Sequence, residues 1–370
     1  MKIAVLTSGG VDSALALHLL KKEGHDVTAC YLKIWLEDEL SFLGECPWED
    51  DLEWIHKICQ QQDVPLEVIP MQQEYRTRII NYTISEARAG RTPNPDLLCN
   101  QHIKFGAFYE LIAHQFEKIG SGHYARVEAD HDRFLLKTAP DSIKDQTYFL
   151  SHLSQEQLSR ALFPLGHFNK AQVRTLANKF QLPNSNRPDS QGLCFLGKIS
   201  FRDFLRYHLG ERPGFFVEIE SGAIVGEHRG FWFYTIGQRR GLELAEGPWF
   251  VCDKNIDENV VYVSRNYYSM DKSRLEFTVT SPHWITTPPA DGYKLKIKLR
   301  HGPRINHCTL ETLGKERLLV KLEERDQGIA PGQFAVFYDN DICLGCAVIE
   351  NETGSIWEKT STYHPSISLT

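Results

Sequence analysis

The sequence predicts an α/β protein in which a doubly wound parallel sheet is followed by two small β domains. Over residues 1–121, short apolar runs alternate with segments whose apolar residues recur at helical spacing, which is typical of βαβ units. After about Arg206, short β-branched or aromatic runs are separated by Gly and Pro, which favours small β domains. We therefore expect three domains, at residues 1–205, 206–274 and 275–370.

The first domain is expected to begin with a strand at residues 2–6 and a helix at 13–22 that Gly24 closes. The next elements expected are a strand at 27–35, a helix with Leu52, Ile55, Ile58 and Cys59 on one face, a strand at 66–69, helices at 75–89 and 105–116, and a strand at 118–121. Residues 153–180 have helical spacing, with N-caps expected at Ser154 and Asn169. Ligands of such a sheet bind at the carboxyl ends of its strands.

The later domains contain short runs that fit strands. These lie at residues 231–236, 260–264, 275–280, 295–300, 318–322 and 334–338. The change from one small domain to the next is expected at residues 273–275.

Composition restricts the class of protein. The sequence has no apolar run of about 18 residues and no secretory signal at its start, so we expect a soluble, cytoplasmic protein without a membrane partner. Nine scattered cysteines indicate reduced thiols rather than a disulfide framework. The net charge of −7 argues against a protein that coats nucleic acid non-specifically, although residues 238–240 and 294–304 could form a local basic face.

The most specific motif is SGGVDS, from Ser8 to Ser13, between the first expected strand and helix. Two glycines let backbone amides approach an anion, and a helix N-terminus favours negative charge, whereas a bare Gly-Gly would indicate only a tight turn. The motif is neither a Walker A loop nor a dinucleotide fingerprint. It resembles the PP-loop of ATP pyrophosphatases, which implies cleavage of ATP to AMP and pyrophosphate, and Asp12 is the expected Mg²⁺ ligand. The segment 192–198 resembles Walker A but is followed by Ile199, so we assign it no phosphate role.

Two cysteines lie outside apolar periodic faces. Residues 91–100, RTPNPDLLCN, contain two prolines and are expected to form an extended loop that presents Asp96 and Cys99. Cys194 lies among Gly, Pro and polar residues. The cysteines expected to be structural are Cys30, Cys59, Cys252, Cys308, Cys343 and Cys346, because a lone buried Cys behaves as a small hydrophobe and a single CxxC does not complete a four-sulfur zinc site.

Seven segments together resemble the bacterial tRNA-specific 2-thiouridylases, the MnmA or TrmU family. They are SGGVDS (8–13), TPNPDLLCN (92–100), GHYAR (122–126), KDQTYFL (144–150), DSQGLCFLG (189–197), YTIGQRRGL (234–242) and PGQFAVFY (331–338). The resemblance implies thiolation of the wobble uridine of tRNA at position 2, with ATP activating the C2 oxygen. An anticodon loop is already single-stranded, so moving its base into a pocket costs little.

The resemblance also implies roles for particular residues. Cys99 would be the nucleophile, Cys194 would carry a persulfide, and Asp96 would act as acid or base. The implied nucleotide pocket comprises Leu6, Thr7, Ser8, Gly9, Gly10, Val11, Asp12, Ser13, Leu32 and Gly122. The implied tRNA contacts are Asn94, Pro95, Asp96, His123, Lys144, Asp145, Gln146, Arg300, His301 and Gln333.

Several alternatives remain open at the level of the sequence. Asp96, Cys99 and Cys194 could hold an iron–sulfur cluster instead of acting through a persulfide. A PP-loop synthetase that transfers ammonia would not need the two cysteines, and a tRNA-binding protein could retain the loop as an ATP sensor. For the thiolation hypothesis, the expected partners are the tRNA anticodon stem-loop and a persulfide donor such as a cysteine desulfurase or a sulfur-relay protein.

Overall fold

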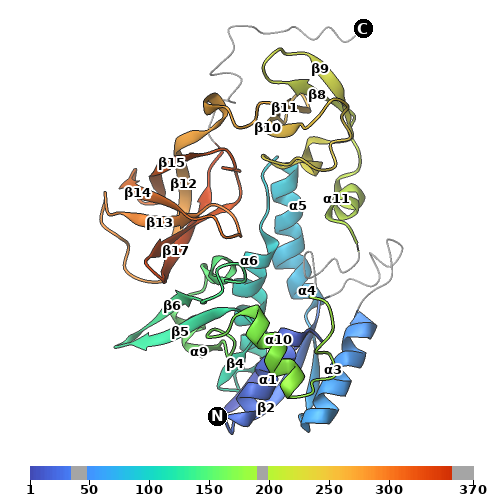
Figure 1. The fold of residues 1–370 in the computed structure, drawn as a ribbon, viewed down its shortest axis with the longest axis vertical. Helices are drawn as coiled ribbons and strands as arrows, with labels where there is room; N and C mark the ends of the chain where they lie inside the picture. The colour runs from blue at the N-terminus through green and yellow to red at the C-terminus, as the bar shows by residue number, and fades with distance from the viewer. Residues whose placement is uncertain (35–47, 190–198, 352–370) are drawn as a thin grey trace.

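A five-stranded parallel sheet organises the first part of the molecule (Figure 1). The computed structural model describes residues 1–34, 48–189 and 199–351. The strands are β1 (Lys2–Leu6), β2 (Asp26–Lys33), β3 (Leu66–Pro70), β4 (Lys118–Gly120) and β7 (Ala161–Leu162), in the order β3-β2-β1-β4-β7. Every neighbouring pair is parallel, which confirms the predicted doubly wound fold. The strand order reverses between β1 and β4, where such sheets bind their ligands.

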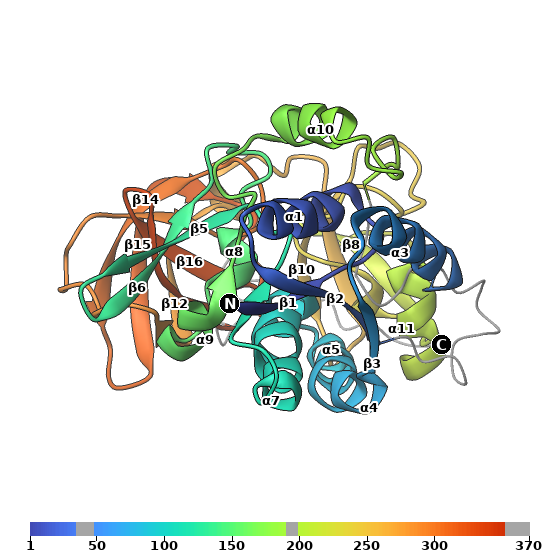
Figure 2. The same cartoon turned by 90° about the horizontal axis from the view of Figure 1, so that it is seen from below.

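Helices cover both faces of this sheet (Figure 2). One face packs against α1 (Val11–Lys22), α3 (Trp48–Gln62) and α10 (Lys170–Lys179). The other packs against α4 (Gln72–Tyr75), η2 (Arg76–Ile80), α5 (Asn81–Arg88), α6 (Pro95–Cys99), η3 (Asn100–Ala107) and α7 (Phe108–Ile112). The predicted amphipathic face of α3 is confirmed, because Ile55, Ile58 and Cys59 are buried.

The segment before Cys99 differs from its prediction. It was expected to be an extended loop, but Pro95 begins α6, which continues directly into the π-helix η3. Proline suits the first helical position, where its missing N–H would have no intrahelical partner. The side chain of Asn94 accepts a hydrogen bond from Leu97 N, so this residue caps the helix. Pro95 therefore starts a helix, whereas Pro93 lies in the non-helical residues before it.

The region 153–180 contains the two predicted helix starts and one strand that the pattern missed. Ser154 caps α9 (Gln155–Arg160) and Asn169 caps α10, each through a capping box. Between these helices lies the two-residue strand β7, which is too short to produce a period. The short helices α8 (Thr147–Leu150) and α11 (Phe201–Leu209) complete the helical part.

A four-stranded sheet follows, made of β8 (Gly214–Glu218), β9 (Ile224–His228), β10 (Phe250–Asn255) and β11 (Val260–Ser264). The strand predicted at 231–236 is wrong, because Phe231–Phe233 form a 3₁₀ turn, η4. Phe231 is buried in the core of this sheet, while Trp232 and Phe233 also contact the core of the first domain. The aromatic run therefore joins two cores instead of alternating across a strand.

The last strands form a closed antiparallel barrel after the 3₁₀ turn η5 (Met270–Lys272). They are β12 (Arg274–Trp284), β13 (Leu295–Lys298), β14 (Asn306–Thr312), β15 (Arg317–Asp326), β16 (Phe334–Asp339) and β17 (Ile342–Ile349). Pairing of β12 with β17 closes the ring. The sequence did not predict that the hairpin β5 (Ala125–Asp130) and β6 (Arg133–Thr138) would extend this sheet through β17. The domain bounds 1–205, 206–274 and 275–370 stay predictions. No helix in the described ranges is long and apolar enough to cross a membrane.

Candidate active site

A cavity of about 310 Å³ opens at the carboxyl ends of β1, β2 and β4. It is lined by Leu6, Thr7, Ser8, Asp12, Ser13, Cys30, Tyr31, Leu32, Ile34, Asp51, Cys99, Ile103, Lys104, Ser121, Gly122, His123 and Gln146. The cavity thus combines side chains of the phosphate-loop motif with Cys99, which lies far from it in the sequence. Leu32 and Gly122, both expected in the nucleotide pocket, also line it.

The phosphate loop is held in shape by its own hydroxyl groups. Ser8 N donates to Ser13 Oγ at 3.2 Å, and this hydroxyl donates to Gly10 O at 3.0 Å. Gly9 has a φ of +71°, which glycine adopts without strain. Gly10 precedes Val11, the first residue of α1, so the helix N-terminus and its positive dipole face the loop. This local geometry is suited to binding phosphate.

Gly122 lies directly against this loop. A Cβ at Gly122 would be 2.8 Å from Asp12 C and 2.9 Å from Ser13 N. Because these are backbone atoms at the start of α1, the loop would have to move to accommodate any side chain. The segment after β4 is therefore fitted to the first turn of α1.

Asp12 belongs to a network of charged side chains. Lys170 Nζ donates to Asp12 Oδ1 at 2.7 Å and Oδ2 at 2.9 Å, and it also lies 2.7 Å from Asp189 Oδ1. The hydroxyl of Tyr124 donates to Asp12 Oδ1 at 2.9 Å. Lys144 contributes a further bond to Asp189 Oδ2, at 2.8 Å. Lys170 therefore connects the carboxylate of the phosphate loop to that of Asp189.

Asp12 is a residue of the cavity wall that could contribute one carboxylate to a magnesium ion. No group of three His, Cys, Asp or Glu within the described ranges could hold a metal ion by itself. Magnesium commonly takes only one or two protein carboxylates and completes its shell with phosphate oxygens and water. Asp12 supplies one carboxylate at the cavity wall, which satisfies this requirement.

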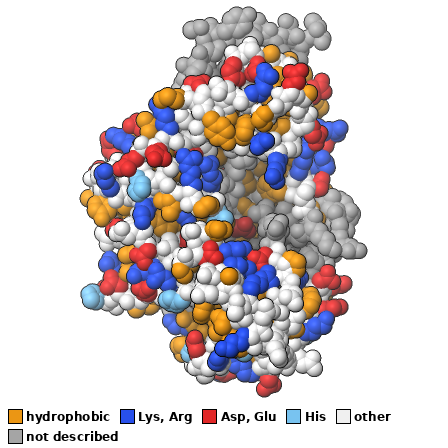
Figure 3. All heavy atoms as spheres, viewed as in Figure 1, with side chains coloured by type: hydrophobic (Ala, Val, Ile, Leu, Met, Phe, Trp, Pro, Cys, Tyr) orange, Lys and Arg blue, Asp and Glu red, His pale blue; other side chains and the backbone are white. Residues whose placement is uncertain are grey.

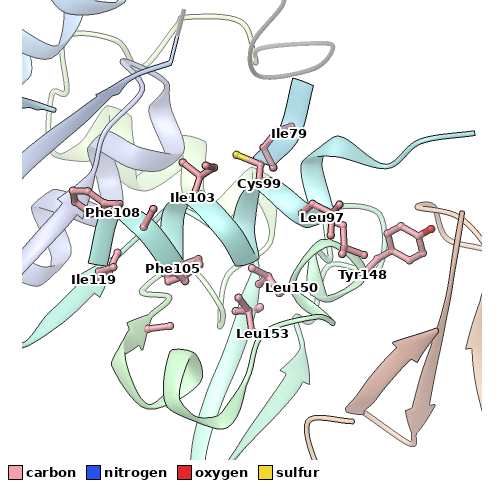
Figure 4. Close-up of a cluster of buried hydrophobic side chains, with 14 of the residues drawn as sticks. Ile79, Leu97, Cys99, Ile103, Phe105, Phe108, Ile119, Tyr148, Leu150 and Leu153 are labelled. Atoms are coloured by element: carbon pink, nitrogen blue, oxygen red, sulfur yellow. The ribbon is translucent and has the colours of Figure 1, made fainter. Parts of the chain in front are cut away.

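Cys99 lies at the end of α6 and lines the cavity together with Ile103, one helical turn later. Figure 4 shows its side chain beside Ile79, on the same continuous helix as Leu97 and Ile103. The residue is only 1% exposed, so a reaction partner can reach the sulfur only through the cavity. Cys194, the expected second cysteine, lies outside the described residues.

His123 and Gln146, which were expected to meet tRNA, line the same cavity. Burial, aided by the charge of Lys104, lowers the pKa of His123 well below its usual value, so the ring is neutral near pH 7. Its Nδ1 lies 2.8 Å from Ser121 Oγ. Gln146 Oε1 accepts a hydrogen bond from Tyr124 N at 3.0 Å. Both side chains are therefore part of the cavity wall.

Comparison with known proteins agrees with this arrangement. Family models match a tRNA methyl transferase HUP domain over residues 1–198, a tRNA methyl transferase PRC-barrel domain over 202–265 and an aminomethyltransferase β-barrel domain over 274–349. The tRNA-specific 2-thiouridylase MnmA of Parabacteroides distasonis is 42% identical over 359 residues, which cover 95% of this chain and all of the relative. The chain belongs to the tRNA-specific 2-thiouridylase family.

Other members of the 2-thiouridylase family match over similar lengths. MnmA of Porphyromonas gingivalis is 41% identical over 94% of this chain and 99% of its own. MnmA 1 of Bacteroides thetaiotaomicron is 43% identical, again over 94% of this chain and 99% of its own. The resemblance noted in seven separate segments thus extends over nearly the whole chain.

The residues that the 2-thiouridylase resemblance assigns to tRNA fall into several places. Asn94, Pro95 and Asp96 form the start of α6, and Asn94 and Pro95 are buried. Arg300 and His301 are exposed just after β13, where Arg300 Nη2 lies 3.3 Å from Asp326 Oδ1. Lys and Arg side chains occur in several separate groups on the face shown in Figure 3, interspersed with acidic side chains.

Asp145, which the resemblance assigns to a tRNA contact, is buried. The residue is 2% exposed, and Lys298 Nζ donates to its Oδ2 at 3.0 Å. Ala139 N and Thr147 Oγ1 also donate to this carboxylate. All of these partners are internal, so Asp145 joins the first domain to the barrel instead of presenting its carboxylate to a ligand. Lys144, next to it, is part of the Asp189 network.

Sequence reasoning missed several residues at the cavity and the loop. Lys170, Tyr124 and Asp51 were not singled out, yet the first two bind Asp12 and the third lines the cavity. No local pattern marks Lys170, which lies 158 positions from Asp12. Cys30, expected to be structural, also lines the cavity, and burial raises the pKa of its thiol to about 12. The Cys30 thiol is therefore protonated and uncharged near pH 7, and it forms part of the cavity wall.

Proposed function

We propose that the protein uses ATP to replace the C2 oxygen of the wobble uridine, U34, of tRNA with sulfur. The products would be 2-thiouridine, AMP and pyrophosphate. The observation that carries this proposal is that Cys99 shares one cavity with Ser8, Asp12 and Ser13 of the phosphate loop. Membership of the 2-thiouridylase family supports the same reaction.

The cavity contains the groups for both steps of this reaction: the phosphate loop for the activation of the oxygen by ATP, and Cys99 for the sulfur transfer. A uridine C2 carbonyl is a poor electrophile because its oxygen is a poor leaving group. Transfer of AMP to that oxygen converts it into a phosphate leaving group, and sulfur can then displace it. The phosphate loop would hold the triphosphate, and Cys99 would face the activated carbon. Asp96, three residues before Cys99, is the proposed acid or base.

The charged side chains around Asp12 would serve the phosphate end of this reaction. Bound Mg²⁺ would neutralise the phosphates, with Asp12 as its protein ligand. Lys170 would then exchange its bond with Asp12 for one with a phosphate oxygen, because both partners are anionic. The helix N-terminus at Gly10 and Val11 would direct its N–H groups toward the same phosphates.

The sulfur step uses both cysteines. We infer that Cys194 receives a persulfide from a donor such as a cysteine desulfurase or a sulfur-relay protein. Attack of the Cys99 thiolate on the inner sulfur would form a Cys99–Cys194 disulfide and release the outer sulfur as hydrosulfide, which carries the electron pair to C2. A reductant must then restore the two thiols. The odd number of scattered cysteines fits a reducing compartment, and we place the protein in the cytoplasm.

Mass spectrometry of nucleosides tests the proposed reaction. tRNA would be incubated with the protein, ATP, magnesium and a persulfide source, and then digested. We expect 2-thiouridine from the wild type and none from Cys99→Ser or Cys194→Ser. Cys308→Ser is the control, because Cys308 is buried in the barrel away from the cavity, and it should retain activity if it folds. Absence of 2-thiouridine with the wild-type protein would exclude the proposal.

A single turnover without reductant separates the persulfide route from an iron–sulfur cluster. After digestion, we expect a peptide containing Cys99 linked to a peptide containing Cys194, and no iron in the active protein. Product formation while both thiols stay unlinked would favour attack by the Cys194 persulfide itself or by a cluster-bound sulfide. Iron in proportion to activity would identify the cluster.

A further inference from the structure

The residues just before the Cys99 helix are held by the barrel rather than by their own domain alone. Gln333 Nε2 donates to Thr92 O at 3.1 Å and to Pro93 O at 3.0 Å. Thr92 N donates in turn to Pro331 O at 2.8 Å. Three hydrogen bonds therefore join two consecutive residues of the first domain to the turn that precedes β16.

The barrel turn is closely fitted to this segment. Gly332 lies between the two barrel residues that make the hydrogen bonds, and its φ is +87°. A Cβ at Gly332 would lie 2.9 Å from Thr92 O and 3.0 Å from Thr92 N. The turn thus approaches to a distance that only glycine permits.

A second link reaches the next residue of the segment. Tyr148 is buried, and its hydroxyl donates to Phe334 O at 3.0 Å. Asn94, the cap of α6, lies 3.5 Å from the same hydroxyl through its Nδ2. In Figure 4, Tyr148 points from beside α6 toward the barrel strands. The cap is therefore connected to the barrel residue that follows Gln333.

These contacts matter because the start of α6 determines where Cys99 lies. Asn94 caps the first turn by accepting a hydrogen bond from Leu97 N, and Pro93 directly precedes this cap. Cys99 is the fourth residue after Pro95, within the same five-residue helix. A shift of the segment at Thr92 and Pro93 would be transmitted directly to the Cys99 sulfur.

We propose that Gln333 is a positioning residue that places Cys99 in the cavity, in addition to any role of the barrel in holding tRNA. This inference rests on the proposed function for its effect on turnover. A side-chain amide has two N–H groups, and both of those of Gln333 are used by Thr92 O and Pro93 O. The amide nitrogen therefore binds the protein's own catalytic segment.

Two substitutions test this role. Gln333→Glu keeps the shape but removes both donors and sets a carboxylate against two carbonyl oxygens, while Gln333→Ala removes the amide. The control is Gln61→Ala, because Gln61 Nε2 also donates to a main-chain carbonyl, Gln181 O, at 2.8 Å, but neither residue lines the cavity. Melting temperatures identify variants that fold, and Gln333→Glu, the closest in shape, carries the test if the alanine variant does not.

The main readout is the rate at which iodoacetamide modifies Cys99 without tRNA, followed on the Cys99 peptide by mass spectrometry. We expect both Gln333 variants to raise this rate about fivefold or more, because loosening α6 exposes a buried thiol. In the same variants kcat should fall about tenfold, equivalent to about 1.4 kcal/mol, while the Kd for tRNA stays within about twofold of the wild-type value. Gln61→Ala should change none of these quantities.

Two results would overturn the inference. Weakened tRNA binding with an unchanged Cys99 modification rate would show that Gln333 acts as a tRNA contact. An unchanged rate together with unchanged tRNA binding would show that it has neither role. The modification rate needs neither ATP nor tRNA, so it remains informative if the wild-type protein makes no 2-thiouridine, the result that would exclude the proposed function itself.

Discussion

The phosphate loop can keep its shape only because Gly122 has no Cβ atom. The glycine follows β4, whereas the loop follows β1, and the two strands are neighbours in the sheet. The space that a Cβ would need is occupied by backbone atoms of Asp12 and Ser13. Unlike a flexible side chain, a helix N-terminus cannot move aside without losing its alignment with a bound phosphate.

We expect Gly122→Ala to raise the KM for ATP about tenfold or more, equivalent to about 1.4 kcal/mol, with a smaller effect on the Kd for tRNA. The measurement is pyrophosphate release at varied ATP concentration. Gly24→Asn is the control, because a Cβ at Gly24 meets nothing within 4 Å and Asn tolerates a positive φ. An unchanged KM for ATP in Gly122→Ala would contradict the close packing described for the loop.

His152 provides a test by pH. Its ring is stacked on His283 of β12, with the ring centroids 4.4 Å apart. Burial, together with the nearby His283 and His102, lowers the pKa of His152 to about 4. An unfolded histidine has a pKa of about 6.5, so the unfolded state binds more protons between these two values and stability falls as the pH falls from about 6.5 to 4.

The His152→Phe variant should lose less stability than the wild type over this pH interval. Phenylalanine also places an aromatic ring against His283, but this ring cannot take a proton. The measurement is the free energy of unfolding by urea at pH 7 and pH 4.5. Each unit of pKa difference corresponds to about 1.4 kcal/mol, so the effect is large enough to measure. Equal losses in both proteins would show that protonation of His152 does not contribute to acid sensitivity.

At the scale of elements, the hairpin β5–β6 is shared between two parts of the molecule. It continues the chain after β4 of the parallel sheet, but β6 pairs with β17 of the barrel, with Leu136 opposite Cys343. Leu136 is fully buried and packs in the core cluster that also contains Cys99, Phe334 and Cys343. The core of the first domain and one side of the barrel are therefore continuous.

Leu136→Ala should destabilise the protein by about 2–5 kcal/mol, because it leaves a cavity in this shared core. We expect the free energy of unfolding to fall by the same amount in the first domain and in the barrel. Hydrogen exchange on peptides from each domain measures these two values. Leu313→Ala is a matched control, because Leu313 is exposed in the barrel, and it should change stability by less than about 0.5 kcal/mol. A shift confined to one domain would show that the two cores unfold independently.

At the scale of the whole molecule, charge limits how tRNA can be held. The chain has a net charge of −7, and many of its exposed cations form ion pairs, such as Lys294 with Glu323 and Arg317 with Glu350. Figure 3 shows basic groups that are separated by acidic ones. We therefore expect tRNA binding to depend on a few phosphate contacts and on the cavity rather than on a continuous basic surface.

Affinity for tRNA should fall only moderately as salt increases. We expect the slope of log K against log salt to be well below that of a protein with about ten phosphate contacts. Titrations at several salt concentrations, with the full-length protein, give this slope. A slope as steep as that of a protein with about ten phosphate contacts would show that an extensive basic surface binds the RNA.

The sequence by itself determined the features that depend on neighbouring residues. The placement of the SGGVDS motif between a strand and a helix was predicted correctly, because its geometry arises within six residues, through two glycines and the hydroxyl of Ser13. The capping boxes at Ser154 and Asn169 were also predictable, because a cap and its partner are three residues apart. The parallel direction of the strands in the first sheet could be predicted from the alternation of strands and helices. The extended loop predicted through Pro95 was wrong, since proline not only ends helices but also begins them.

Only the tertiary structure decided which distant residues meet. Lys170 reaches Asp12 across 158 positions, and Gln333 reaches Thr92 across 241. The hairpin β5–β6 joins the barrel because strand pairing depends on available edges and on buried side chains such as Leu136, not on the strand's own pattern. Hydrogen-bond donors and charges in a sequence do not specify their partners. Chain folding brings the partners together, and close packing then determines which of them make contact.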